Sequence, residues 1–115
     1  MTIQQCYQEI QGDYADVYHR IPSEALIKKF ALKFLDDQSM EQLTAALRSG
    51  DAEAAFRAAH TLKGLCLNLS FSAMAAPACE LTELLRGRQL SGYEAAYERL
   101  LQEYEKTVNS LKKVD

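Results

Sequence analysis

The chain has 115 residues, 48% of them hydrophobic, which suffices for one domain with a hydrophobic core. Thirteen Lys and Arg against sixteen Asp and Glu give a net charge of −3. This charge argues against the basic surface that nucleic acid or an anionic membrane requires, so we expect proteins as partners. No apolar stretch approaches the roughly 20 residues of a transmembrane helix.

The three cysteines, Cys6, Cys66 and Cys79, are odd in number and lack metal-ligand spacing. No basic start followed by an apolar run marks a signal peptide. A reduced, cytoplasmic protein is therefore expected. The length predicts one domain over residues 1–115. Met1 and the helix-capping patterns near both ends favour a free-standing protein, and we expect it to be a monomer.

Helical periodicity runs through the whole chain, whereas strand signals are nearly absent. Val occurs at only three positions, and no segment alternates apolar and polar residues over the length of a strand. The first two helices are expected to be short. Thr2 and Gln5 match a capping box for the first, and Gly12-Asp13 separates it from a second with apolar residues from Tyr14 to Ile21.

Turn and capping signals predict the next two helices. Pro22-Ser23 opens a helix with apolar residues at helical spacing from Leu26 to Leu35. Ser39 and Gln42 match a capping box for the following helix, which is expected to end at Ser49-Gly50, with glycine after the last turn.

Asp51 caps the longest apolar-periodic segment, which runs to about Leu69 and has His60 in its middle. At roughly 100° per residue, its core-facing half contains Ala55, Ala58, Leu62, Leu65, Cys66 and Leu69. The opposite half contains Glu53, Phe56, Arg57, His60, Lys63, Gly64, Leu67 and Asn68. His60 is therefore expected to be exposed. Phe56 and Leu67 on the same face indicate a docking surface, unless a phase error of one position puts them under a neighbouring helix.

Two further helices complete the chain. The first carries apolar residues from Met74 to Leu85, and Pro77 is expected to loosen its first turn or to kink it. Ser91 and Glu94 match a capping box for a last helix with an apolar face from Tyr93 to Leu111. Short connections favour antiparallel neighbours. The expected fold is all-α, an antiparallel four-helix bundle with one or more extra short N-terminal helices.

The residues around His60 are suited to phosphate chemistry. Lys63 and Gly64 lie one turn after His60 on the same face. An exposed neutral imidazole has a ring nitrogen free to attack a phosphoryl group, and the Lys63 ammonium complements the dianion that results. Gly64 leaves room for a second protein over the ring, and glycine inside a helix costs about 1 kcal/mol relative to alanine, so it needs a packing or access reason. Arg57 and Asn68 can hydrogen-bond a phosphate, although solvated surface is their commoner role.

The segment His60-Thr61-Leu62-Lys63-Gly64, preceded by Ala58-Ala59 and followed by Leu65 to Phe71, resembles the motif of histidine-containing phosphotransfer (HPt) domains. These domains are small helical bundles that relay phosphoryl groups in two-component phosphorelays. The resemblance implies that His60 is the phosphoacceptor, that Lys63 assists the phosphoryl group and that Gly64 admits a receiver-domain protein. Ser70 departs from the family, which often has glycine at this point, and the departure concerns the turn rather than the chemistry.

The resemblance also implies which groups come from other proteins. HPt domains have no nucleotide or metal site of their own, and this chain has no glycine-rich phosphate loop and few acidic residues near His60. The receiver domain of the partner would supply the aspartate and the Mg²⁺. We expect a carrier without autokinase activity, whose partners are response-regulator receivers or a hybrid histidine kinase. Its expected docking residues are Phe56, Arg57, Leu67 and Asn68.

Two other functions stay open. A bundle of the same fold could dock receivers without phosphotransfer. A metal-binding or unrelated enzyme usually needs Glu-x-x-His spacing or inward carboxylates, and Arg57 and Lys63 on either side of His60 would repel a metal ion. His19 has no companion motif and is expected to be structural or solvated. Cys66 and Cys79 could face each other across two helices, but we expect a buried free thiol instead.

Overall fold

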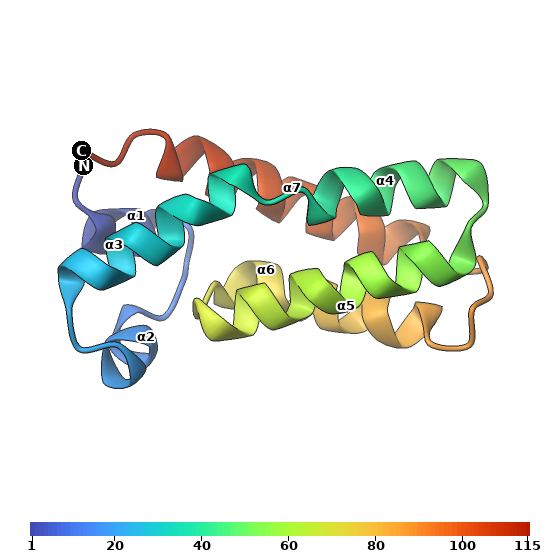
Figure 1. Ribbon diagram of the computed structural model, residues 1–115, viewed down its shortest axis with the longest axis horizontal. Coiled ribbons are helices and arrows are strands. Elements are labelled where there is room, and N and C mark those ends of the chain that lie inside the picture. The colour runs from blue at the N-terminus through green and yellow to red at the C-terminus, as the bar shows by residue number, and fades with distance from the viewer.

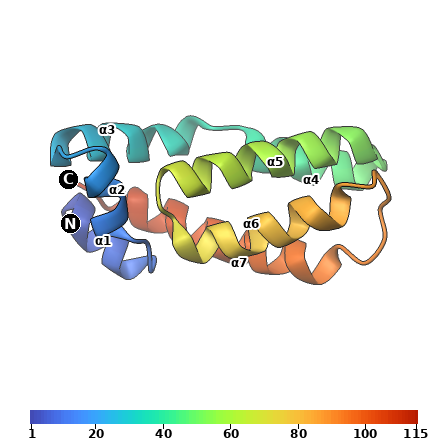
Figure 2. The same cartoon turned by 90° about the horizontal axis from the view of Figure 1, so that it is seen from below.

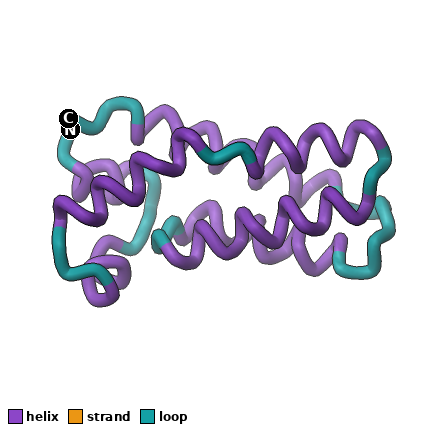
Figure 3. Tube along the Cα trace, viewed as in Figure 1, coloured by secondary structure: helices purple, strands orange, loops and turns teal.

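A computed structural model describes residues 1–115 and contains helices joined by loops and no strand, which confirms the expected all-α fold (Figure 3). Seven α-helices and one 3-10 helix, η1, follow along the chain. Their bounds are α1 (Ile3–Glu9), α2 (Tyr14–Arg20), α3 (Glu24–Lys33), η1 (Phe34–Asp36), α4 (Ser39–Ser49), α5 (Ala52–Asn68), α6 (Ser72–Leu85) and α7 (Glu94–Leu111).

The four longest helices, α4 to α7, form an antiparallel bundle (Figures 1 and 2). α5 packs between α4 and α6, and α6 packs on α7, in a molecule that measures 40 × 23 × 20 Å. α3 and η1 extend in line with α4 beyond the bundle, where α1 and α2 join them at one end (Figure 1). The two termini meet there, and the backbone N–H of Asp115 donates to the carbonyl of Met1 at 2.9 Å.

One hydrophobic core of 27 buried residues runs from α1 to α7. Tyr7 ties α1 to the turn between α5 and α6, because its hydroxyl donates to the carbonyl of Leu69 at 2.7 Å. The Tyr7 ring also lies 5.5 Å from the rings of Tyr14 and Phe71. Burial raises the pKa of Tyr7 far above its ordinary value. The N-terminal helices therefore share the core of the bundle.

Several predicted helix starts are confirmed by their caps. Thr2 and Gln5 form a complete capping box, and the side chains of Asp13, Ser23 and Asp51 each accept a backbone N–H in the first turn of α2, α3 and α5. Gly50 ends α4 with a φ of +74°, a conformation that glycine adopts at little cost.

Two predicted capping boxes are wrong. Ser39 is already the first residue of α4, and its N–H donates to the Asp37 carboxylate at 2.9 Å, so Asp37 takes the acceptor role expected of the Gln42 side chain. Ser91 lies outside α7, which starts at Glu94 without a side-chain cap. Gly92 precedes that start with a φ of +72°, and the turn it makes delays the helix.

Pro77 does not interrupt α6. The helix runs from Ser72 to Leu85 without a break at its first turn, because a proline in the second turn removes only one backbone hydrogen bond.

The predicted apolar stripe of α3 is only partly buried. In α3, Ile27 and Ala31 are buried, whereas Leu26 and Phe30 of the same predicted apolar stripe are exposed. The reason is that α3 extends beyond the bundle and has neighbours on one side only.

Candidate functional site

α5 is the helix that carries His60, and it lies between α4 and α6. The Asp51 carboxylate accepts the N–H of Ala54 at 3.1 Å and so starts the helix. Small residues allow α5 to approach its neighbours closely, and the buried side is formed by Ala55, Ala58, Ala59, Leu62 and Cys66. The predicted core face is confirmed, apart from Leu65, which is only half-buried.

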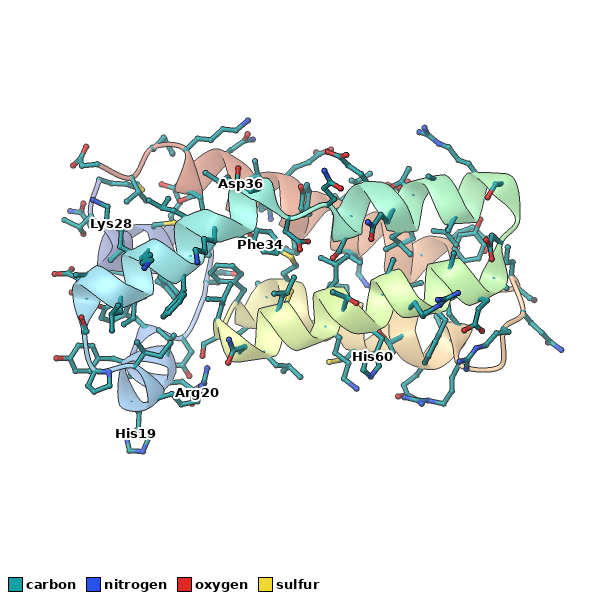
Figure 4. The ribbon with its side chains drawn as sticks, viewed as in Figure 1. His19, Arg20, Lys28, Phe34, Asp36 and His60 are labelled. Atoms are coloured by element: carbon teal, nitrogen blue, oxygen red, sulfur yellow. The ribbon has the colours of Figure 1, made fainter.

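His60 is exposed, as predicted, and lies in the middle of α5 on the side away from α4 (Figure 4). Its imidazole makes no hydrogen bond within the chain, so both ring nitrogens are open to an external group, and its ring centre lies 5.9 Å from that of Phe56. His19, the second histidine, is exposed on α2, at the end of the molecule that the N-terminal helices form (Figure 4).

Lys63 and Gly64 follow His60 by one turn. Lys63 is half-buried and forms no ion pair within 4 Å. The pKa of the nearby Glu83 carboxyl is lowered mainly by hydrogen bonds from Arg86, and the Lys63 ammonium adds to this effect. Gly64 is exposed, and a Cβ built on it meets no atom within 4 Å. The chain itself therefore gives no packing reason for a glycine at this place.

Phe56 is buried, with 9% of its surface exposed, so the prediction of an exposed Phe56 is wrong. Two arginines from the connection between α6 and α7 cover its ring. The guanidinium carbon of Arg88 lies 3.8 Å from the ring centre, and that of Arg86 lies 5.6 Å from it. The helical projection places residues of α5 correctly but cannot show what a later loop lays over them.

Arg86 and Arg88 join His60 at a shallow pocket of 440 Å³, whose lining residues are Phe56, Arg57, His60, Thr61, Arg86 and Arg88. Sequence reasoning identified Arg57 at this place and missed the other two arginines. They lie in the connection after α6, in the tripeptide Arg86-Gly87-Arg88. No local pattern in the sequence connects this tripeptide with His60.

Leu67 and Asn68 lie toward the C-terminal end of α5 and are both exposed, Leu67 by 51%. They do not line the pocket at His60. Leu67 instead borders a neighbouring groove with Cys66 and Cys79. Of the predicted docking residues, the structure thus places Arg57 beside His60, Leu67 and Asn68 farther along the same helix, and Phe56 beneath the arginines.

Ser70 forms the turn between α5 and α6, where the sequence departs from the HPt pattern. Its φ is +56°, and the N–H of Phe71 donates to the carbonyl of Cys66 at 2.9 Å, which is the hydrogen bond of a Schellman turn. The Ser70 hydroxyl donates to the Asp16 carboxylate and accepts from Arg20, both at 2.7 Å. Serine therefore makes the turn that glycine favours. This confirms that residue 70, where the chain differs from the HPt pattern, belongs to the turn.

All three cysteines are free. Cys6 and Cys66 are buried, and burial raises the pKa of the Cys66 thiol to about 12. Cys66 and the half-buried Cys79 border the same groove, so the two thiols do lie on facing helices. No three His, Cys, Asp or Glu side chains gather as metal ligands. None of the helices is both long and apolar enough to span a membrane.

The family model of the Hpt domain matches residues 34–110. The match begins at η1 and ends near the end of α7, so it contains the bundle and His60, and it leaves α1 to α3 outside. No curated protein and no solved structure matches the chain significantly.

Proposed function

Because the chain belongs to the Hpt domain family, whose members transfer phosphoryl groups through a histidine in phosphorelays, we propose that it carries a phosphoryl group on His60. The group comes from the aspartate of one receiver domain and passes to the aspartate of another. The observation that supports this most is the exposed imidazole of His60, which has no partner in the chain and lies one turn before an unobstructed glycine.

In the transfer step, a nitrogen lone pair of His60 attacks the phosphorus of the receiver's aspartyl phosphate. The new N–P bond forms while the P–O bond to aspartate breaks, and the carboxylate leaves with the electron pair. The Mg²⁺ that offsets charge at the phosphoryl oxygens belongs to the receiver. Transfer to the second receiver is the reverse of this step on another aspartate.

The neighbours of His60 have distinct parts in this proposal. Lys63 has no carboxylate partner within 4 Å, so its ammonium is free to meet a phosphoryl oxygen. Gly64 lets the receiver approach the ring, because nothing of this chain occupies the space beside it. Arg57, Leu67 and Asn68 contact the receiver, whereas Phe56, being buried, acts by holding the arginines that cover it.

Three broader features belong to the same proposal. The chain acts as one domain and as a monomer, and it does so in the cytoplasm, where its three free thiols stay reduced. It has no kinase activity of its own and receives phosphoryl groups from a hybrid kinase or a response regulator.

The test is phosphotransfer from a panel of purified, phosphorylated receiver domains. We expect one receiver or more to label the chain, with the acid-labile and base-stable phosphate of phosphohistidine. His60→Gln should abolish labelling, and His19→Gln, the matched control on α2, should label as the natural chain does. Labelling of His60→Gln would refute the assignment of His60. A receiver that binds but never transfers its label would select a docking module without turnover.

A further inference from the structure

The pocket beside His60 gathers more positive charge than the phosphotransfer motif requires. Three arginines line it together with His60. Arg57 comes from α5, and Arg86 and Arg88 come from the connection between α6 and α7. The chain as a whole has a net charge of −3, so this concentration is not a general property of its surface.

Arg88 is held firmly at this place. Its guanidinium carbon lies over Phe56, 3.8 Å from the ring centre, and its Nε forms an ion pair with Glu53 at 2.8 Å. Its φ is +57°, a conformation that residues other than glycine rarely adopt, and Nη1 donates to the carbonyl of Arg86 at 2.6 Å. The ring contact and the ion pair keep the guanidinium over Phe56, at the pocket that His60 also lines.

Arg57 and Arg86 are held less firmly, since neither guanidinium lies as close to the Phe56 ring as that of Arg88 and both have replaceable partners. Nε of Arg57 lies 3.4 Å from Glu53, and 72% of the arginine side chain is exposed. Arg86 donates from Nε and Nη2 to the two oxygens of Glu83, at 3.0 and 2.8 Å. Exposed ion pairs stabilise a protein very little, so a stronger anion can take either arginine from its carboxylate.

We propose that Arg57, Arg86 and Arg88 form a binding site for the phosphoryl group carried by His60. A dianionic phosphoryl group accepts paired hydrogen bonds from guanidinium groups more strongly than an exposed carboxylate does. Arg86 then leaves Glu83, Arg57 leaves Glu53, and Arg88 stays over Phe56 as the fixed part of the site. The inference rests on the proposed function only in taking His60 as the residue that is phosphorylated.

The test uses potassium phosphoramidate, a small anionic phosphoryl donor, on the full chain and without any receiver domain. The lone pair of a histidine nitrogen forms the new N–P bond while the P–N bond of phosphoramidate breaks, and ammonia leaves with that electron pair. Both exposed histidines can react. His19, which has no arginine cluster like that of His60, serves as the internal reference for the rate at His60.

The arginine cluster attracts the anionic donor, so we expect the ratio of the His60 rate to the His19 rate to fall about fivefold in the double variant Arg57→Gln, Arg86→Gln. The matched control is Arg99→Gln with Lys106→Gln. Each double variant removes two exposed ion pairs and two positive charges, but Arg99 pairs with Glu80 and Lys106 with Glu103, outside the pocket. The control ratio should equal that of the natural chain.

Arginine side-chain NMR of the natural chain gives a second readout. Once His60 is phosphorylated, the Nε–H resonances of Arg57 and Arg86 should shift, and that of Arg99 should not. A merely structural role for these arginines predicts an unchanged rate ratio and unmoved resonances, and that result would overturn the proposal. If no receiver ever labels the chain, the relay fails, but this experiment still decides whether the arginines bind the phosphoryl group.

Discussion

The middle of α5 and the turn at its end differ in where glycine occurs and where the backbone favours it. Gly64 lies within a regular helix, where any residue fits, and an added Cβ would touch nothing. Ser70 has a φ of +56°, where glycine is the favoured residue, yet a serine occupies it.

Contacts within the chain explain the residue at position 70 but not the glycine at position 64. Arg20 and Asp16, which come from α2, hydrogen-bond the Ser70 side chain, and Arg20 also donates to the carbonyls of Leu67 and Asn68. The structure thus explains Ser70 from within the chain. It gives no such explanation for Gly64, whose reason we assign to the partner that approaches His60.

The largest effect is expected for Gly64→Gln, which puts a long side chain into the open space that we propose the receiver enters. Phosphotransfer should fall about 100-fold, because misplacing the reacting groups by about 1 Å has an effect of that size. Stability should not fall, since glutamine favours a helix more than glycine does. Transfer from a phosphorylated receiver and urea unfolding would be measured on the same protein.

Gly64→Ala is the control, because the alanine side chain is larger than that of glycine and smaller than that of glutamine. Alanine should raise the free energy of unfolding by up to about 1 kcal/mol, with a smaller loss of transfer than glutamine causes. If Gly64→Gln transfers phosphate at the natural rate, the access explanation for this glycine is wrong.

The second comparison replaces Ser70. Alanine keeps the unfavourable φ and loses both side-chain hydrogen bonds, so Ser70→Ala should lower the free energy of unfolding by about 2 kcal/mol. Glycine loses the same bonds but adopts the conformation freely, so Ser70→Gly should be about 1 kcal/mol less destabilising than alanine. Urea unfolding would measure both. Equal losses would show that the backbone at residue 70 is not strained.

The smallest effect concerns the acid sensitivity of the same turn. Hydrogen bonds from Arg20 and Ser70 hold the pKa of the Asp16 carboxyl below its ordinary value. Because the pKa is lower in the folded chain, Asp16 stabilises the fold at neutral pH, and this contribution disappears as the pH falls through the folded value.

Asp16→Asn is the matched variant for this effect. The natural chain should be the more stable at pH 7, and the difference in urea midpoint should narrow as the pH falls below about 4, the ordinary pKa of an aspartate. The other carboxylates titrate in both proteins and cancel in the comparison. A difference that stays constant with pH would mean that the Asp16 charge does not anchor α2.

Local patterns account for what could be predicted. The caps by Thr2, Ser23 and Asp51 depend on residues three positions apart, and the phase of α5 depends on its own apolar spacing, so the exposure of His60 followed from one segment. Even local patterns failed at Ser39, whose N–H donates to the Asp37 carboxylate instead of the Gln42 side chain.

Only packing between helices could decide the rest. Phe56 lies on the outward face of α5, but Arg88 reaches over its ring from a loop beyond α6. A projection of one helix cannot contain this contact, because the contact depends on how α5 and α6 lie side by side.

By itself, the sequence determined the helices, the outward position of His60 with Lys63 and Gly64, and the resemblance to the HPt family, since each depends on residues close together in the chain. Only the tertiary structure decided that Arg86 and Arg88 lie at the His60 pocket and that α2 secures the turn at Ser70. The physical reason is the same in both cases. These side chains act through short-range hydrogen bonds, stacking and charge, and folding alone brings residues distant in sequence within that range.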